Sequence, residues 1–304
     1  MKAVIQTKSG PPEVLKLVDI EKPVPKDDEM LIKIHAATVT KGDTVLRKLP
    51  RIVWPLFRFL GMRVKKIPGY EFAGEIEKVG KDVKQFKKGD QVFGTTTGTN
   101  SGTNTEYICL PEVRKKGVLA LKPSSMTFEE AAAIPIGGMS PLYTIKGKIK
   151  RGDKVLIYGA SGSVGTYAVQ LAKYFGAEVT GVCSTKNIEM VRSIGADNVI
   201  DYKKEDFTKR AEKYDVIFDA VIKTSKSACK DILKEEGVFL SIRSFTKEEN
   251  ENLIFLKKMF EEGKLKAVID KSYPLEKIVE AHRYVEKGHK KGNVVISVIS
   301  SKKS

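Results

Sequence analysis

The sequence predicts an α/β protein built from two parts, a β-rich first part and a doubly wound parallel sheet. Residues 1–118 read as short alternating strands separated by glycine and proline turns, a pattern typical of β domains. After residue 154, apolar strands alternate with segments of helical composition, the order that produces a parallel sheet covered by helices. A chain of 304 residues is long enough for two domains, each with its own core.

In the first part, alternation of apolar and polar residues predicts strands over 1–6, 14–25, 29–39, 68–80, 91–94 and 105–111. Residues 47–66 combine aromatic and basic side chains. This stretch either covers an active site or partner surface, or packs as an ordinary loop on its own domain, and the sequence leaves both readings open. At Thr127 the pattern changes to a helix, with Thr127 as the N-cap and Glu129 and Glu130 in the first turn.

Residues 154–186 organise the second part. An apolar strand at 154–158 leads into a turn with Gly159, Gly162 and Gly165, a helix follows and ends at Gly176, and a second strand covers 178–183. Such a turn lets backbone N–H groups reach a diphosphate at the helix N-terminus. The spacing is G-x-x-G-x-x-G rather than G-x-G-x-x-G, so the flanking strand and helix carry the prediction of a dinucleotide site. The alternative is a glycine-rich packing turn without a ligand.

The end of the second strand predicts which dinucleotide is bound. Enzymes specific for NAD usually place an acidic residue there, where it binds the ribose hydroxyls and repels a 2′-phosphate. This chain instead has Ser184, Thr185 and Lys186, two hydroxyls and a cation that suit a phosphate. We therefore expect NADP(H) rather than NAD(H); the alternative is an ordinary solvated loop.

The rest of the second part continues the alternation. Strands are expected at 198–202, 215–221, 237–242 and 265–270, and helices at 203–213, 225–236 and 247–263. A last helix at 274–288 and a strand at 293–300 can return to the first part of the chain.

Composition narrows the classes of partner. The net charge is +16, but the lysines are scattered and no basic cluster or nucleic-acid module is present, so nucleic acid is not expected as a partner. Cys109, Cys183 and Cys229 lie far apart, which predicts neither a disulfide framework nor a zinc site. The apolar stretch at 52–62 is too short to span a bilayer, and the N-terminus lacks a signal-peptide core. No membrane association is expected, and the expected location is the cytoplasm.

Several segments, in order along nearly the whole chain, resemble the medium-chain dehydrogenase/reductase superfamily and, within it, the zinc-free quinone oxidoreductase-like (zeta-crystallin-like) reductases. The segments are GYEFAGEIEKVG, FKKGDQVFG, EEAAAIPIGGMSPLYT, YGASGSVG, SIGADNVIDYKKEDF and EEGKLKAVIDKSYPLEKIVEAHRYVEKGHKKGNVVISV. The resemblance implies a GroES-like partial β-barrel catalytic domain made of 1–118 and 270–304. It also implies a Rossmann domain over 119–269 and an active site in the cleft.

The resemblance also bears on metal. Zinc-dependent members bind zinc through Cys, His and a later Cys or Glu, where this chain has Thr40, Tyr70 and Gly138. None of these is an ordinary zinc ligand, so no metal is expected.

The implied activity is zinc-independent hydride transfer from NADPH to a quinone or an α,β-unsaturated carbonyl, with hydrogen-bond donors polarising the carbonyl oxygen. Thr40 and Tyr70 are the candidate catalytic donors. Zinc-free relatives commonly have Asn at the place of Thr40 and Tyr at the place of Val45.

Candidate cofactor residues match family positions or follow the carboxyl ends of predicted strands. They are Gly138, Met139, Ser140, Gly159, Ser161, Gly162, Ser163, Val164, Gly165, Ser184, Lys186, Tyr202, Ala220, Val221, Ser241, Ile242 and Arg243. Asn293 stands where relatives often have Lys.

Two other functions stay open. Some zinc-free relatives bind RNA, and an enoyl-thioester reductase would use residues 47–66 to contact the phosphates of a carrier. Family members are often dimers, so a homodimer is expected. His35, His282 and His289 have no carboxylate or serine at triad spacing and are expected to be structural or solvated.

Overall fold

A computed structural model describes residues 1–50, 52, 66–243 and 246–299. The backbone forms two compact units: the first contains Met1–Pro135, Glu248–Ile254 and Ile269–Ser304, and the second contains Ile136–Lys247 and Phe255–Val268. Compactness alone does not define a domain, so the division predicted from the resemblance, 1–118 with 270–304 and 119–269, stays a prediction. The aromatic residues of the 47–66 stretch lie outside the described residues, and the interpretation of that stretch remains open.

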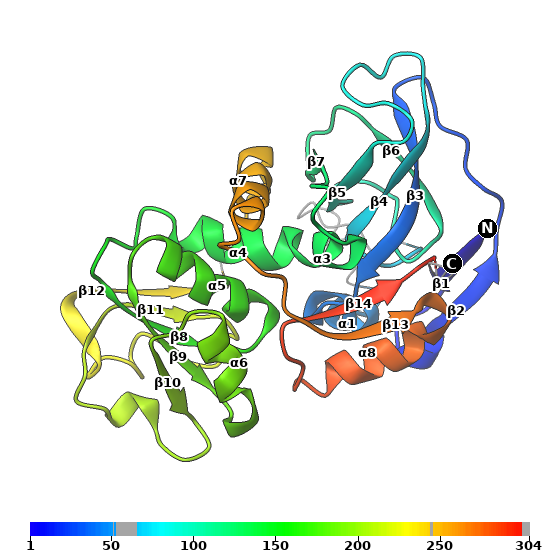
Figure 1. Ribbon diagram of the computed structural model, residues 1–304. Helices are drawn as coiled ribbons and strands as arrows, with labels where there is room; N and C mark the ends of the chain where they lie inside the picture. The colour runs from blue at the N-terminus through cyan, green and yellow to red at the C-terminus, as the bar shows by residue number, and fades with distance from the viewer. Residues whose placement is uncertain (51, 53–65, 244–245, 300–304) are drawn as a thin grey trace. The chain divides into compact units, whose positions relative to one another are not determined.

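The first unit is built on a seven-stranded sheet in the order β13-β14-β3-β4-β5-β7, with β6 also pairing with β3 (Figure 1). The strands are β3 (Glu29–Thr38), β4 (Glu71–Val79), β5 (Gln91–Thr95), β6 (Tyr107–Pro111), β7 (Leu119–Leu121), β13 (Ile269–Pro274) and β14 (Asn293–Ser297). Alternation along β3 places Met30, Ile32 and Ile34 in the core. The chain end returns as predicted, because β14 pairs antiparallel with β3.

Further strands and helices complete the described part of the first unit. β1 (Lys2–Gln6) and β2 (Leu15–Asp19) form an antiparallel pair, with the 3-10 turn η1 (Pro12–Val14) between them. The helices are α1 (Lys41–Lys48), α3 (Phe128–Ala133) and α8 (Ile278–Glu286), the last preceded by η5 (Leu275–Lys277). Thr127 caps α3 in a capping box with Glu130, which confirms the predicted helix start. α3 packs on β3 and β4, and α8 packs on α1 and β13.

The second unit has a parallel five-stranded sheet in the order β10-β9-β8-β11-β12 (Figure 1). The strands are β8 (Lys154–Tyr158), β9 (Glu178–Cys183), β10 (Asn198–Asp201), β11 (Tyr214–Asp219) and β12 (Leu233–Ser241). The chain moves outward from β8 to β9 and β10, then crosses to β11 on the other side. This order confirms the doubly wound prediction and creates a switch point between the carboxyl ends of β8 and β11.

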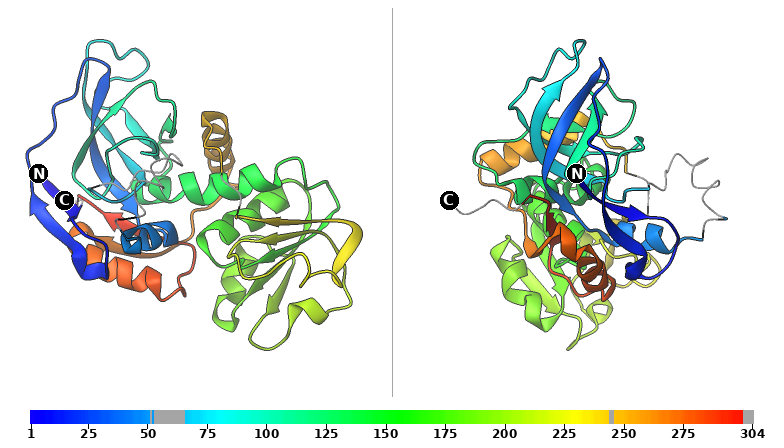
Figure 2. Two further views of the ribbon diagram at one scale, coloured as in Figure 1. Left: turned by 180° about the vertical axis from the view of Figure 1, so that it is seen from behind. Right: turned by 90° about the vertical axis from the view of Figure 1, so that its right-hand side faces the viewer.

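The other described helices are α4 (Pro135–Ile145), α5 (Ser163–Tyr174), α6 (Ile188–Ser193) and α7 (Asn250–Glu261), with the 3-10 turns η3 (Thr185–Asn187) and η4 (Phe207–Lys209). Residues 250–254 of α7 belong to the first unit and residues 255–261 to the second. α5 packs on β8 and β9, and α6 lies beside β9 and β10; Figure 2 shows the same elements from two other sides. No helix in the described ranges is both long and apolar enough to span a bilayer.

Two predicted helices are wrong. The 203–213 segment forms only η4, because the backbone is extended again at Arg210. The 225–236 segment forms successive turns, and β12 already begins at Leu233, which pairs with Tyr214 of β11. Cys229, Ile232 and Leu233 are buried with Phe207 in one apolar cluster. Packing into this cluster and pairing with β11 therefore override the local helical composition.

Candidate active site

The glycine turn after β8 has the geometry of an anion site. Gly159 has φ +82°, and its N–H and that of Ala160 both donate to the carbonyl of Val182 at 3.1 Å. A Cβ on Gly165 would lie 2.1 Å from the carbonyl oxygen of Gly159, so the start of α5 packs closely on the turn. Gly162 caps α5 without a side-chain acceptor. The first turn of this helix is thus suited to an anion, which both the helix dipole and N–H donors favour.

The predicted phosphate end lies where β9 and β10 finish side by side. Tyr202 donates its N–H to the carbonyl of Cys183 at 3.1 Å, which brings the loop after β10 next to Ser184 and Lys186. Ser184 is buried, whereas Lys186 is exposed and Tyr202 is 46% exposed. An exposed cation and an exposed phenol at one sheet edge are compatible with a phosphate ligand.

Asp201 is a carboxylate at this edge that sequence reasoning did not single out. Its oxygens accept hydrogen bonds from the hydroxyl of Thr185 at 2.5 Å and from the N–H of Lys203 at 3.0 Å. The bond from Thr185, opposed by desolvation, lowers the pKa of Asp201. Thr185 is therefore directed to Asp201, and Ser184 and Lys186 remain as the phosphate candidates.

Asn187 connects the phosphate end to the glycine turn. It is 4% exposed, and its Nδ2 donates to Oγ of Ser161 at 2.9 Å. Its N–H donates to the carbonyl of Ser184 at 2.8 Å. Asn187 thus fixes the loop after β9 against the turn after β8. An amide following the Ser-Thr-Lys sequence was a weak signal, and sequence reasoning missed it.

The loops after β11 and β12 lie at the same carboxyl end of the sheet, on the side of β8 away from β9 and β10. Asp219, fully buried at the end of β11, accepts from the N–H groups of Val221 at 2.9 Å and Thr224 at 3.0 Å. Its own carbonyl accepts from the N–H of Ile242 at 3.3 Å. These bonds bring together the predicted residues that follow the two strands, which are Ala220, Val221, Ser241, Ile242 and Arg243.

The remaining predicted cofactor residues lie on α4 or begin α5. On α4, Met139 is fully buried and Gly138 is buried, whereas Ser140 is half-buried and its Oγ accepts from the hydroxyl of Thr246 at 3.2 Å. The partly exposed residues at the turn and the start of α5 are Ser161, Gly162, Ser163 and Val164. Their contact with a cofactor stays a prediction.

In the first unit, Asp43 accepts a hydrogen bond from one candidate catalytic residue, Thr40, and its charge acts on the other, Tyr70. Thr40 is the N-cap of α1, and its hydroxyl donates to Oδ2 of Asp43 at 2.5 Å. The N–H groups of Thr40 and Asp43 complete a capping box at 2.7 and 3.2 Å. The Asp43 charge also acts on the Tyr70 phenol, because burial first and this charge second raise the Tyr70 pKa well above its usual range. Tyr70 therefore stays protonated and can donate a hydrogen bond.

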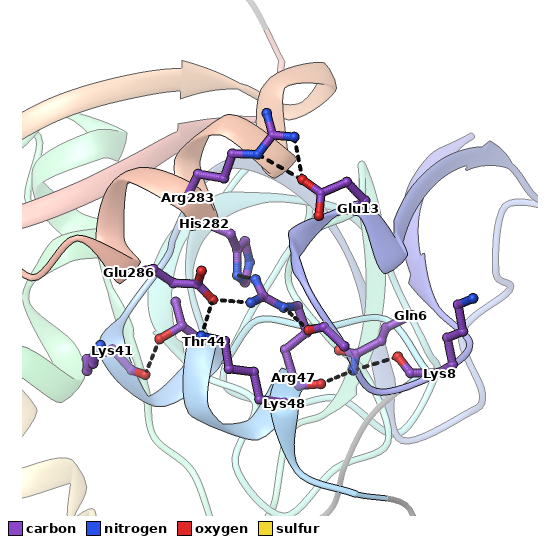
Figure 3. A network of polar contacts seen from close by, with 11 residues as sticks. Gln6, Lys8, Glu13, Lys41, Thr44, Arg47, Lys48, His282, Arg283 and Glu286 are labelled. Carbon is purple, nitrogen blue, oxygen red and sulfur yellow. Dashed lines mark hydrogen bonds and ion pairs between the residues drawn. The ribbon is translucent and has the colours of Figure 1, made fainter.

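A buried cation holds α1 in place. Arg47, 1% exposed, ion-pairs with Glu286, approaches Nδ1 of His282 at 3.1 Å and donates to the carbonyl of Gly10 at 3.1 Å (Figure 3). Burial and the Arg47 charge lower the pKa of His282 to about 3, so His282 is neutral. This confirms the structural role expected for His282 and ties α1 to α8. Arg47 was expected only as part of the basic stretch.

Comparison with known proteins identifies the family. Residues 26–146 match the alcohol dehydrogenase GroES-like domain, and residues 163–276 match the zinc-binding dehydrogenases. A 2-methylene-furan-3-one reductase from Solanum lycopersicum is 35% identical over 98% of this chain and 79% of its own length. The chain belongs to the medium-chain dehydrogenase/reductase superfamily.

Other members of this superfamily are also close. An NADPH-dependent alkenal/one oxidoreductase from Arabidopsis thaliana is 32% identical over 97% of this chain and 79% of its own. The solved quinone oxidoreductase from Coxiella burnetii has a TM-score of 0.82 at 28% identity, and the match covers 98% of this chain and 99% of that chain. The GroES-like and Rossmann architecture implied by the resemblance is thereby confirmed.

The matched family is named for zinc, and the donor set here does not fit zinc. Thr40, Tyr70 and Gly138 occupy the positions that correspond to zinc ligands in zinc-dependent members. The Thr40 hydroxyl is hydrogen-bonded to Asp43, the Tyr70 phenol stays protonated and Gly138 has no side chain. Within the described part of the chain, no three His, Cys, Asp or Glu side chains gather as metal ligands.

Proposed function

We propose that this protein is an NADPH-dependent, zinc-independent reductase that transfers hydride to a quinone or an α,β-unsaturated carbonyl. The relatives named for alkenal/one, furanone and quinone reduction support the reaction class. The cofactor proposal depends on the residues at the carboxyl end of β9. Ser184 and Lys186 follow this strand, and the nearby Asp201 accepts a hydrogen bond from Thr185. A 2′-phosphate would meet a cation and a hydroxyl there, and the nearby Asp201 carboxylate already accepts hydrogen bonds from Thr185 and Lys203.

When bound, NADPH supplies a hydride from C4 of its nicotinamide. For an enone, the new C–H bond would form at the β-carbon and the electron pair of the C=C bond would move toward the carbonyl oxygen, giving an enolate. A proton from solvent water would then add to the α-carbon and complete the saturated product. Tyr70, kept protonated by its surroundings, donates a hydrogen bond to that oxygen. The Thr40 hydroxyl donates to Asp43, so we assign the role of donor to Tyr70 alone.

The test is an acceptor assay with chelator-treated protein. NADPH or NADH is mixed with 1,4-benzoquinone, a simple enone or the matching enoyl thioester, and cofactor absorbance is followed. We expect saturable oxidation of NADPH that exceeds that of NADH and needs an acceptor but no added zinc. Strict dependence on zinc would contradict the proposal, and activity confined to the thioester would favour the carrier-dependent alternative.

We also propose that the protein is a homodimer in solution, as family members often are. β12 supports this proposal because it forms an edge of the five-stranded sheet and exposes 38% of Val238. Light scattering after size-exclusion chromatography tests it: a mass near twice 33.7 kDa is expected, and a monomer at micromolar concentration would contradict it.

A further inference from the structure

Ile222, in the loop after β11, has an unusual backbone conformation. Its φ is +57°, and among the described residues it is the one non-glycine residue with a positive φ. The left-handed region is unfavourable for L-residues, and more so for a β-branched side chain. Its side chain is 43% exposed, so incomplete burial offers little compensation for the strain.

The surrounding structure enforces this conformation. The buried Asp219 carboxylate binds the N–H groups on both sides of Ile222, those of Val221 and Thr224, at 2.9 and 3.0 Å. The N–H of Ala220 donates to the carbonyl of Tyr158 at 3.0 Å, which fixes the loop start to the end of β8. The loop is therefore shaped before any ligand arrives.

The loop lies at the switch point of the sheet, against the glycine turn. A Cβ on Gly159 would lie 2.5 Å from a methyl carbon of Val221, so the Val221 side chain fills the space that Gly159 leaves. The glycine turn with the diphosphate candidate residues and the strained loop after β11 are thus in direct contact. The predicted adenosine end lies over β9, so a dinucleotide that crosses the diphosphate turn places its nicotinamide half toward β11.

We propose that Ile222 is a cofactor-positioning residue whose left-handed backbone places an apolar side chain against the nicotinamide-ribose half of bound NADPH. The proposal rests on the NADPH function above. A glycine at this position would adopt the same backbone conformation without strain. We therefore attribute the presence of isoleucine to a contact that its side chain makes with the bound cofactor. Strain of this kind is typical of ligand sites where the surrounding structure over-determines the backbone.

Two variants separate the strain from the contact. Ile222→Gly removes both, and we expect its Tm to rise by about 2–4 °C while the Kd for NADPH rises roughly fivefold. Ile222→Ala retains a Cβ in the left-handed region but loses most of the apolar surface. The Kd of Ile222→Ala for NADPH should rise as it does for Ile222→Gly, but its Tm should rise less. Binding is measured by quenching of protein fluorescence with NADPH alone.

Gly152→Ala is the matched control. Gly152 has φ +88° and open space around it. It lies just before the amino end of β8, whereas the candidate cofactor residues follow the carboxyl ends of the strands. This variant adds left-handed strain away from the cofactor, so its Tm should fall while its Kd stays at the wild-type value. If both Ile222 variants bind NADPH like the wild type, or if Ile222→Gly loses stability as well as affinity, the proposal is wrong. A wild type that does not bind NADPH would overturn the proposed function together with this inference.

Discussion

At the scale of single residues, the proposal assigns cofactor choice to one cation, Lys186, and one hydroxyl, Ser184, at the end of β9. Lys186 is exposed, and its neighbour Thr185 is bound to Asp201, whose other oxygen accepts from Lys203. Charge-assisted hydrogen bonds to phosphate are roughly twice as strong as neutral ones, so Lys186 should contribute most of the preference for NADPH.

Lys186→Ala tests this assignment. The variant should raise the KM for NADPH about tenfold, the loss expected for one ionic contact, and leave the KM for NADH within about twofold. Steady-state kinetics with one fixed acceptor measure both values. Lys230→Ala, at another exposed lysine of the same unit, is the control. Equal effects of Lys186→Ala on the two cofactors would contradict a phosphate contact.

Tyr70→Phe tests the proposed hydrogen-bond donor. Removing one donor to a developing oxyanion typically costs about 100-fold in kcat, whereas NADPH binding should not change. Because the pKa of Tyr70 is raised, this phenol stays protonated in wild type, and its titration should cause no loss of rate between pH 7 and 9. Tyr143→Phe, at a tyrosine that is 44% exposed, is the control. An unchanged kcat in Tyr70→Phe would remove Tyr70 from the mechanism.

At the scale of elements, α1 depends on charges buried beneath it. α1 begins at the Thr40–Asp43 capping box and ends near Arg47, whose guanidinium reaches Glu286 and His282 of α8 (Figure 3). A buried charge without its partners is costly, so this network fixes one arrangement of the two helices. The helix that carries Thr40 is thereby held from its other end.

His282 makes the stability of this network depend on pH. Folded His282 has a pKa of about 3, whereas an unfolded histidine titrates near 6.5. Between these values the unfolded chain binds the extra proton, so stability is complete above about pH 6.5 and is lost as pH falls toward 3. Urea unfolding from pH 7 to 5 should show a loss of about 1 kcal/mol per pH unit below pH 6 from this group.

His282→Gln should reduce that slope, since glutamine can still accept from Arg47 but does not titrate. His289→Gln, at an exposed histidine, should leave the slope unchanged. A wild-type slope identical to that of His282→Gln would show that His282 does not titrate as described.

Much of the fold was predictable at this scale because local pattern and tertiary structure agree. Alternation in 29–39 predicts β3, and the glycine spacing after residue 158 predicts the turn into α5. The helices at 203–213 and 225–236 were predicted wrongly, because burial of Cys229 and Ile232 beside Phe207 is a tertiary effect. α1 was missed because Gly42, Thr44 and Val45 are poor helix formers, although the Thr40–Asp43 spacing was a capping signal.

The site was predictable only where it follows from motifs. The glycine turn and the Ser184–Lys186 end are sequence signals that the topology brings to one sheet edge. Asn187 binds Ser161, 26 residues earlier in the chain, so sequence spacing does not reveal it. Asp43 and Asp219 bind neighbours within five residues, but only the fold shows that they lie at the candidate site. The positive φ of Ile222 has no sequence signal at all, because isoleucine is among the residues least suited to it.

At the scale of the whole molecule, the proposed reaction draws on residues of both units. The parallel unit supplies an edge suited to a dinucleotide, and the mixed-sheet unit supplies the Thr40–Asp43–Tyr70 group. The positions that hold zinc in related enzymes carry Thr40, Tyr70 and Gly138, which are not ordinary zinc ligands, and the proposed reduction relies on hydrogen bonds and on hydride from the cofactor. Direct hydride transfer from NADPH to an acceptor is therefore the central claim.

The most direct test follows the hydride itself. Chelator-treated protein is incubated with a simple enone and NADPH carrying deuterium at C4, in separate reactions for the two faces of the nicotinamide, and the product is analysed by mass spectrometry and NMR. We predict that one of the two labelled cofactors delivers its deuterium to the β-carbon of the saturated ketone. A saturated product without deuterium from either cofactor, or the absence of product despite NADPH binding, would contradict hydride transfer to an enone.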